Sequence, residues 1–505
     1  ACSKFNGMWA FAFFDLKTGD LFLSKDRFGK KPLYFYLSDE GLYFASEAKS
    51  LLTMIGKKFS LNYQVIGEFL FQSQINASSA YFLNDICQIP ASTIIHFSFV
   101  DKVRQKKSIQ YWDFPNKESD EIISDSLIQT VREKFFNAVN IRLRSDVPVG
   151  ILLSGGLDSS SIASAVNHLN NNEVVLFSAV DNNPQYDESP YIDTMANYLG
   201  KNVKKMNLSL DKENIFNILE ELIWLNDQPV ASLSNLSHHL LVKMARDSGI
   251  KVLMTGQGAD ELLCGYRKYL MFYVQYLIRN GKLRKAYKVI SDFHKNKTII
   301  SQFNFSEAKR YLKYFSEKGI KDSKGDALKD VNQLNIGLEK RSTIASRQLM
   351  DYKYFSLPQL LHTEDRMSMA VSTEMRVPFL DVELVETVLP LSIDCKIKNG
   401  WTKYIFRKSM EQYLPSTITW RKDKQNFGNA QGELLKGFLS EEIRNNYFSP
   451  DSLIFKKQIM KRNRLMKTFG KYINQPVNKG LVAYKEIFAP ISLEIWLRKY
   501  ENYIV

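Results

Sequence analysis

The chain has 505 residues, 45% of them hydrophobic, so it is too long for one compact domain and apolar enough to bury two or three cores. No apolar run approaches the ~20 residues of a membrane helix, and the first residues lack the features of a secretory signal. We therefore expect a soluble, cytoplasmic protein with no membrane partner. The four cysteines are widely spaced and form no CxxC pair, which argues against a zinc site and against a disulfide framework.

The formal net charge is +14, and part of the excess lies between Arg279 and Lys324, where basic residues alternate with aromatic ones. Such a segment can bind nucleic acid, but a solvated helical face is the commoner explanation. We therefore predict no nucleic-acid partner.

Residues 1–115 are predicted to form a β-rich domain. Apolar runs joined by short turns predict two hairpins, the first from residues 8–15 and 21–26 and the second from residues 32–37 and 42–46. A helix and one more strand complete the predicted domain, and they are expected over residues 62–73 and 92–100.

A second domain is predicted over residues 120–505, after a polar, turn-rich linker at 111–121. Short buried strands alternate there with helices, the strands at residues 148–154, 174–180, 202–209 and 251–256 and the helices at 158–170, 188–200 and 236–249. Such alternation indicates an α/β fold, with a parallel sheet flanked by helices. Beyond Tyr266 the strand signals fade, and the remainder is predicted to be mainly helical.

The segment VGILLSGGLDSSS, residues 149–161, leads from a predicted strand through a glycine turn into a helix. Ligands of open α/β sheets bind at such strand ends, and a helix N-terminus favours anions. The loop lacks the lysine of a GxxxxGK[ST] motif. Hydroxyls of Ser154, Ser159 and Ser160 can bind phosphate, and Asp158 is best explained as a magnesium ligand. The loop therefore suits magnesium pyrophosphate as a leaving group, whereas the alternative is an ordinary glycine turn with a serine cap.

A second motif, KVLMTGQGADELLCGY, ends the predicted strand at 251–256. It places Thr255 and Gly256 beside the expected nucleotide, and Asp260 opens the next helix. A carboxylate that faces Asp158 across pyrophosphate would complete a magnesium site whose other ligands are phosphate and water. The alternative is that Asp260 only favours the helix dipole.

The loop SGGLDSS resembles the signature of ATP pyrophosphatases, and the chain as a whole resembles glutamine-hydrolysing asparagine synthetases. The matching segments occur in order along the chain: FNGMWAFAFFD, LFLSKDRFGKKPLYFY, FASEAKSLL, PVGILLSGGLDSSSIAS, VLMTGQGADELLCGY, DRMSMAVSTEMRVPFLD, KYIFRKSM and WRKDKQNFG. The resemblance implies an adenine nucleotide hydrolase-like synthetase domain after a β-rich glutaminase-like domain of αββα type. It also implies that aspartate is adenylated by ATP with Mg²⁺, and that ammonia, released from glutamine in the full-length family, converts β-aspartyl-AMP to asparagine, AMP and pyrophosphate.

The resemblance assigns roles to individual residues of this chain. Lys403 is implied to face the reacting phosphate and carboxylate, and Asp158 and Asp260 are implied to hold the metal. The implied ATP-binding residues are Leu152, Ser154, Gly155, Gly156, Asp158, Ser159, Ser160, Val180, Thr255 and Gly256. Lys422 and Lys424 are weaker phosphate-binding candidates. The expected partners are these small molecules, and the resemblance leaves room for a homodimer.

Two positions depart from the family pattern. Many relatives carry a carboxylate where this chain has Gln257, and an amide can orient ammonia but cannot act as its general base. Position 257 is thus a catalytic position without a base, which weakens the assignment of aspartate as substrate. Cys264 stands where a glycine is usual, and the sequence offers no physical account of it.

The segment HTEDRMSMAVSTEMRVPFLD sets charges of both signs close together, as a pocket for an amino acid requires. The candidate substrate-binding residues are Asp365, Arg366, Glu374 and Arg376. A buried ion-pair network that locks helices together would account for each of them equally well.

The first domain resembles the later part of a class II glutaminase domain, whose nucleophile is an N-terminal cysteine. Cys2 does not fit that role, since Ala1 precedes it and its surroundings match a stretch deep inside that domain. About the first hundred residues of the family pattern are therefore expected to be missing, through truncation, an incomplete gene model or a separate partner chain. The chain as given is expected to use free ammonia only.

Three other functions stay open on sequence grounds. A related enzyme could amidate another acid, such as a sugar acid or a β-lactam precursor. A tRNA-modifying enzyme with a pyrophosphatase loop is compatible with the charge of +14, but the glutaminase-like segment and the lack of paired cysteines argue against it. A noncatalytic subunit is disfavoured because Ser154, Asp158, Asp260 and Lys403 are all present.

Overall fold

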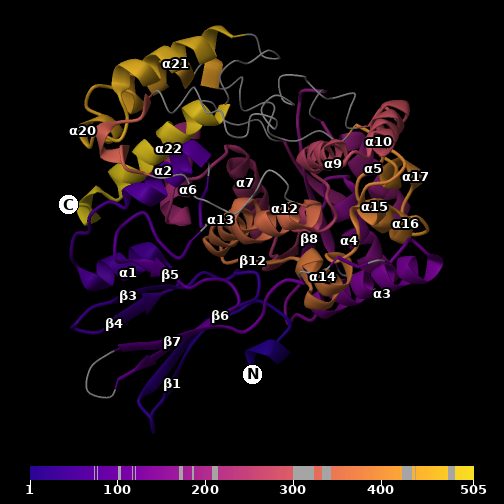
Figure 1. The fold of residues 1–505 in the computed structure, drawn as a ribbon, viewed down its shortest axis with the longest axis horizontal. Coiled ribbons are helices and arrows are strands. Elements are labelled where there is room, and N and C mark those ends of the chain that lie inside the picture. Colours follow the sequence, from indigo (N-terminus) through magenta and orange to yellow (C-terminus); the bar gives the residue numbers. More distant parts are fainter. Residues whose placement is uncertain are drawn as a thin grey trace.

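The computed structural model describes residues 1–72, 74–76, 78–99, 104–115, 118–119, 121–169, 174–184, 187–207, 214–298, 323–331, 343–423, 435–437, 439–475 and 484–505. None of the helices in these ranges has both the length and the apolar character that a bilayer span requires. The antiparallel sheets of the N-terminal part and the helices of the C-terminal end lie side by side in Figure 1.

Two antiparallel sheets form the N-terminal part (Figure 1). One has the strand order β1-β2-β6-β7 and the other β4-β3-β5, with β1 Ala10–Asp15, β2 Asp20–Lys25, β3 Tyr34–Leu37, β4 Leu42–Ala45, β5 Cys87–Gln88, β6 Thr93–Ser98 and β7 Arg104–Gln110. Both predicted hairpins are confirmed. The sequence missed β7, because its residues are mostly polar, and β5, because it has two residues.

The two sheets pack face to face through a cluster of apolar side chains, Leu21, Leu23, Leu33, Phe35, Ile89, Ile95 and Phe97. Alternation along each strand sends these side chains inward. The opposite face of the β4-β3-β5 sheet packs against helices α1 (Ala48–Ile55) and α2 (Tyr63–Gln72).

A five-stranded parallel sheet forms the centre of the second part, with the order β10-β9-β8-β11-β12. Its strands are β8 Val149–Leu152, β9 Val175–Val180, β10 Val203–Asn207, β11 Val252–Met254 and β12 Glu374–Arg376. The four predicted strands and their parallel arrangement are confirmed. The described chain beyond Tyr266 is mainly helical, as predicted, but β12 adds a fifth strand there, in which Met375 is the one apolar side chain.

Helices cover both faces of this sheet, as the α/β prediction requires. Helices α3 (Asp125–Arg142), α4 (Leu157–His168) and α5 (Ser189–Leu199) pack in the core cluster of one face. Helix α7 (Ser234–Asp247) packs on the other face, against Phe177, Leu253 and Met375.

The remaining helices surround the sheet and extend to the C-terminus (Figure 1). They are α6 Ile215–Asn226, α8 Ala259–Leu262, α9 Arg267–Arg279, α10 Leu283–Lys295, α12 Ile344–Met350, α13 Leu357–Met369, α14 Val382–Val388, α15 Ile393–Lys396, α16 Tyr404–Met410, α17 Ser416–Thr419, α19 Leu439–Glu442, α20 Leu453–Lys456, α21 Arg462–Asn474 and α22 Tyr484–Lys499. Helix α22 shares one hydrophobic cluster with α2, α6 and the β4-β3-β5 sheet, so the two ends of the chain have a common core.

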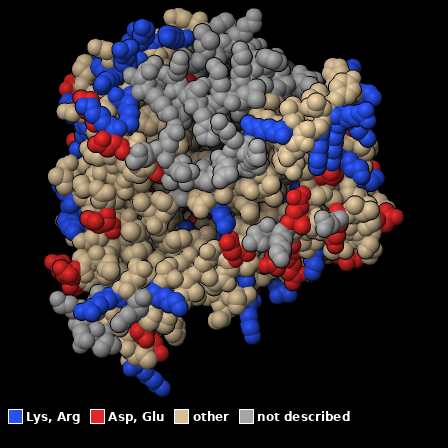
Figure 2. Space-filling model, in the orientation of Figure 1, with Lys and Arg blue, Asp and Glu red and all other residues tan. Residues whose placement is uncertain are grey.

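Of the basic segment, residues 279–298 and 323–324 are described, and they include helix α10. Only Ala286 and Phe293 of α10 are buried, and Lys and Arg side chains gather on the surface around it (Figure 2). This is the solvated helical face that the sequence indicated. The stretch from residue 299 to residue 322 lies outside the described residues.

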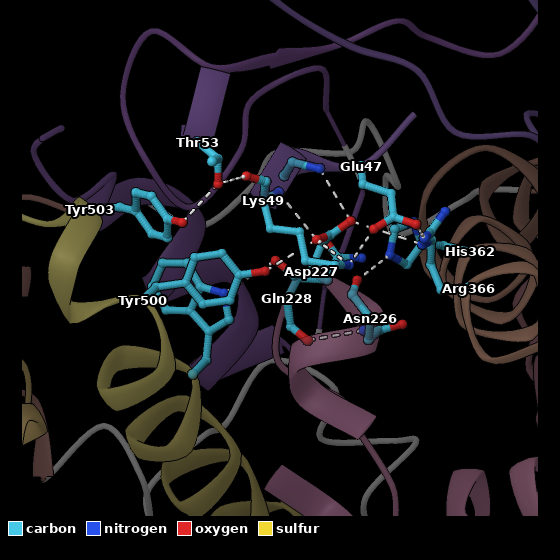
Figure 3. Close-up of polar contacts among 12 residues, drawn as sticks. Glu47, Lys49, Thr53, Asn226, Asp227, Gln228, His362, Arg366, Tyr500 and Tyr503 are labelled. Atoms are coloured by element: carbon cyan, nitrogen blue, oxygen red, sulfur yellow. Dashed lines mark hydrogen bonds and ion pairs between the residues drawn. The ribbon is translucent and has the colours of Figure 1, made fainter. Parts of the chain in front are cut away.

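The buried carboxylate of Asp227, just after α6, joins three parts of the chain (Figure 3). It accepts hydrogen bonds from the backbone N–H groups of Ala48 and Lys49 at 3.1 and 3.3 Å, from Lys49 Nζ at 3.0 Å and from the hydroxyl of Tyr500 at 3.1 Å. Glu47, the N-cap residue of α1, makes no side-chain cap. Asp227 therefore caps α1 from a different part of the chain.

We predict that Asp227→Ala lowers the free energy of unfolding by about 3–5 kcal/mol, because it leaves Lys49 and the first turn of α1 without their buried partner. Urea unfolding followed by circular dichroism measures this loss. The control is Glu383→Ala, which breaks an exposed ion pair to Lys134 and should cost less than about 1 kcal/mol. Equal effects of the two substitutions would show that Asp227 does not hold these parts together.

Candidate active site

Two loops meet at the carboxyl ends of adjacent parallel strands. Strand β8 leads into residues 153–156 and α4, and β11 leads into residues 255–258 and α8. A Cβ on Gly256 would lie 2.9 Å from the Cβ of Asp158, so the two loops touch only because residue 256 is glycine. Gly155 has φ +63°, and a Cβ there would lie 2.6 Å from the Cβ of Tyr191.

Serine hydroxyls gather at the N-terminus of α4. The backbone N–H of Ser154 donates to Ser159 Oγ at 3.1 Å, and the two hydroxyls also lie 3.1 Å apart. Ser160 Oγ is fully buried and has no hydrogen-bond partner among the described residues. Leu152 and Val180 end the paired strands β8 and β9 and so lie at the same edge of the sheet.

The ammonium of Lys403 lies between two carboxylates. Its Nζ is 2.9 and 2.7 Å from the carboxylate oxygens of Asp158 and 2.6 Å from Oδ1 of Asp260. Burial lowers the pKa of Lys403, but the charges of the two aspartates outweigh burial and raise this pKa above its ordinary value. Lys403 therefore carries a full positive charge at neutral pH.

The backbone around this triad is adapted to the close approach. Lys403 has φ +56° at the N-terminus of α16, which is unusual for a residue other than glycine. A Cβ on Gly265 would lie 1.9 Å from Oδ1 of Asp260 and 2.2 Å from Cε of Lys403, so only glycine fits there. The aspartates, Lys403 and Gly265 thus form one packed unit.

The structure gives the missing account of Cys264. Its φ is +55°, a left-handed conformation that glycine adopts without strain, which explains why glycine suits this position. Burial raises the pKa of the Cys264 thiol to about 12, so the thiol stays protonated and packs as a small apolar group. Gln257, the other position that departs from the family pattern, belongs to the 255–258 loop and is half-buried.

Arg421 is a site residue that the sequence analysis missed. Its guanidinium donates to the carbonyl oxygen of Gly155 at 3.2 Å, pairs with Glu188 at 2.8 Å and stacks over the ring of Tyr191. It thereby braces the glycine loop. The signal was present, because Arg421 belongs to the WRKDKQNFG segment from which Lys422 and Lys424 were chosen instead.

Lys422 is exposed, and Lys424 lies outside the described residues.

Each of the charged residues chosen for a substrate pocket contacts another charged side chain. Asp365 accepts a hydrogen bond from Lys31 Nζ at 2.7 Å, and Arg366 pairs with Glu47. Arg376 Nε contacts Glu374 at 2.7 Å.

The Nη1 atom of Arg376 donates to the carbonyl oxygens of Arg142 and Arg144 at 2.7 Å each, just before β8 begins. The ion pairs of Asp365 and Arg366 are of the buried kind that the sequence left open as the alternative, whereas Glu374 and Arg376 pair within strand β12. A substrate-binding role for the four residues stays a prediction.

Cys2 is buried, and its Sγ lies 3.6 Å from the hydroxyl of Ser24. Ser24 belongs to strand β2, so Cys2 packs against that strand. A structural role for this thiol stays a prediction.

Comparison with protein families assigns both parts of the chain. Residues 130–498 match the asparagine synthase family, and residues 1–112 match the glutamine amidotransferase domain family. The first match contains both loops, Lys403 and Arg421. Residues 113–129 lie between the two matched ranges.

Curated relatives match most of the chain. Glutamine-hydrolyzing asparagine synthetases 1 and 3 of Bacillus subtilis (strain 168) are 28% and 27% identical to it over 88% and 98% of its length, which corresponds to 71% and 79% of their own. Amidase chry2 of Gibberella zeae is 25% identical over 82% of the chain and 68% of its own length. The chain therefore belongs to the asparagine synthase family of ATP-dependent, amide-forming ligases.

Proposed function

We propose that this protein adenylates the side-chain carboxylate of aspartate with ATP and transfers the acyl group to ammonia, which yields asparagine, AMP and pyrophosphate. The observation that carries the proposal is the buried ammonium of Lys403 between Asp158 and Asp260, beside the serine-rich loop. This cluster lies where open α/β sheets bind their ligands.

ATP would bind with its phosphates at the N-terminus of α4. The N–H groups of the first turn and the hydroxyls of Ser154 and Ser159 are hydrogen-bond donors of the kind that phosphate oxygens accept. The unpartnered hydroxyl of Ser160 is a further donor, although it is fully buried. Arg421 keeps the glycine loop in place from outside.

The donors at this site fit magnesium. Asp158 and Asp260 present hard carboxylate oxygens on two sides of one spot, and Mg²⁺ prefers to take one or two carboxylates together with phosphate and water. A magnesium ion bound here supplies positive charge that offsets the charge of the leaving pyrophosphate.

Lys403 would stabilise charge that develops during the reaction. Its raised pKa keeps it protonated, and burial strengthens its interaction with an anionic transition state. With Asp158 and Asp260 as ligands of magnesium, part of the hydrogen-bonding capacity of the Lys403 ammonium would be free for the substrate phosphate.

Gln257 would orient the attacking ammonia from the 255–258 loop. Its amide can donate and accept hydrogen bonds but cannot take up a proton at neutral pH. The proton of the attacking ammonia must therefore go to another group or to water. The acceptor acid is part of the proposal, and the similarity to an amidase keeps a different carboxylic acid as the second candidate.

Asp158→Asn should abolish pyrophosphate release, with a loss of at least about 100-fold in turnover, because one magnesium ligand and one partner of Lys403 lose their charge. Release is measured with ATP, Mg²⁺, ammonium and aspartate. Asp193→Asn, an exposed aspartate on α5 that pairs with Lys205, serves as the matched control. Full activity of Asp158→Asn would remove the residue from the mechanism.

Lys403→Met should reduce kcat by about 100- to 1,000-fold and change the Kd of ATP much less, since the ammonium acts on charge that exists mainly in the transition state. Rapid quench measures turnover, and isothermal titration calorimetry measures binding. If affinity and turnover fall by the same factor, Lys403 only binds nucleotide.

A panel of acids tests the substrate. With ATP, Mg²⁺ and ammonium, we expect pyrophosphate release with aspartate and not with other carboxylic acids. Release with a sugar acid or another acid in place of aspartate would select the second candidate function.

With glutamine as nitrogen source, Cys2→Ala should behave as the unmodified chain does, because the Cys2 thiol is buried against Ser24.

A further inference from the structure

Helix α13 places a buried carboxylate between the N-terminal part and the candidate ATP site. Glu364 is 2% exposed. Its Oε1 accepts a hydrogen bond from the hydroxyl of Thr255 at 2.8 Å, and its Oε2 accepts one from Nζ of Lys30. A chain of two hydrogen bonds thus connects residue 30 with the loop that follows β11.

Lys30 is held rigidly on its own side. The carboxylate of Asp26 accepts hydrogen bonds from the backbone N–H groups of Phe28, Lys30 and Lys31 at 3.0–3.1 Å, which fixes the turn. Gly29 has φ +70°, and a Cβ there would lie 3.1 Å from the Cβ of Ala91, so this turn is also packed closely. Lys30 itself is 1% exposed.

The other end of this hydrogen-bonded connection, Thr255, lies beside the proposed reacting groups. Thr255 precedes Gly256, and Gly256 lies against Asp158. The backbone N–H of Thr255 donates to the carbonyl oxygen of Arg376 at 3.0 Å. The hydroxyl and the N–H of Thr255 are therefore both fixed, one by Glu364 and one by β12. A shift of Thr255 would move Gly256 against Asp158.

A buried carboxylate that loses its cation is costly, because its charge is no longer compensated in a medium of low polarity. Glu364 would then turn toward another donor, which alters its hydrogen bond to Thr255. The ammonium of Lys30 prevents this change.

We infer that Lys30 is a positioning residue for the ATP site, which acts through Glu364 to hold Thr255 and the 255–258 loop against Asp158. This inference rests on the proposed function and extends it: the glutaminase-like part supports the ATP-dependent half-reaction even when free ammonium supplies the nitrogen. Lys30 itself touches none of the proposed reacting groups.

The test uses the full chain with ATP, Mg²⁺, ammonium and aspartate. Lys30→Met should raise the KM for ATP about tenfold and weaken ATP binding by a similar factor. Lys30→Met combined with Glu364→Gln should restore most of the affinity, since the neutral amide oxygen still accepts from Thr255 and no unpaired charge remains. In a Thr255→Val background, Lys30→Met should have no further effect on the KM for ATP, because the connection is already cut.

Lys49→Met is the matched control, since Lys49 also joins the N-terminal part to the rest through a buried carboxylate, that of Asp227. It should lower the melting temperature and leave the KM for ATP unchanged. If Lys30→Met does not fold, two double variants without a buried charge take its place in the test. The variant with Lys30→Met and Glu364→Gln should bind ATP. The variant with Lys30→Met and Glu364→Met should bind ATP about tenfold more weakly.

The outcomes separate the two proposals. Unchanged ATP binding in Lys30→Met, or equal binding by the two neutral pairs, would overturn the role of Lys30 while the proposed function stands. An unmodified chain that neither binds ATP nor releases pyrophosphate would overturn the proposed function instead. Additive effects of Lys30→Met and Thr255→Val would also overturn the inference, because they would mean that the two residues act independently.

Discussion

The ammonium of Lys403, buried between two aspartates, determines how the carboxyl edge of the parallel sheet is built. Asp158 and Asp260 lie at the starts of helices that follow two neighbouring strands, and without a cation their like charges would repel one another. The cation can reach both only because Gly265 leaves room beside it and Lys403 adopts a left-handed backbone conformation. The local strain is thus the cost of placing one charge within reach of both loops.

Charged residues also join the N-terminal part to the rest of the chain. Apolar packing around α22 supplies the area, and non-directional contacts of this kind tolerate small shifts between the packed elements. Ion pairs from Lys30, Lys31 and Glu47 to consecutive residues of α13 are directional and short, so they set the register of the two parts. Buried charges that fix register at a cost in stability are known from other folds.

The sequence predicted those elements whose burial imposes a simple pattern. Continuous apolar runs gave β8, β9 and β11 of the parallel sheet, and apolar runs joined by turns gave both hairpins. Strand β10 has two lysines and is largely exposed. The sequence did not predict strands β7 and β12, because their side chains are mainly polar or charged. Their strand conformation depends on pairing with β6 and β11.

The candidate site likewise contains residues that a local sequence pattern revealed and residues that it did not. The loops that carry Asp158 and Asp260 were found because glycine, serine and aspartate occur there at a strand end, within a few residues of each other. Lys403 came only from the family resemblance, since a lysine near a helix start carries no signal of its own. Glu364 pairs with a residue 334 positions away, and no periodicity or local motif encodes such a pair.

The geometry of α13 explains why adjacent residues of this helix contact different parts of the protein. Successive residues of an α-helix point about 100° apart, so three of them in a row cover roughly 200° of its circumference. Glu364 faces Lys30 and Thr255, Asp365 faces Lys31, and Arg366 faces Glu47 near Asp227. These contacts point in different directions around α13, so a rotation of the helix about its own axis would break several of them at once.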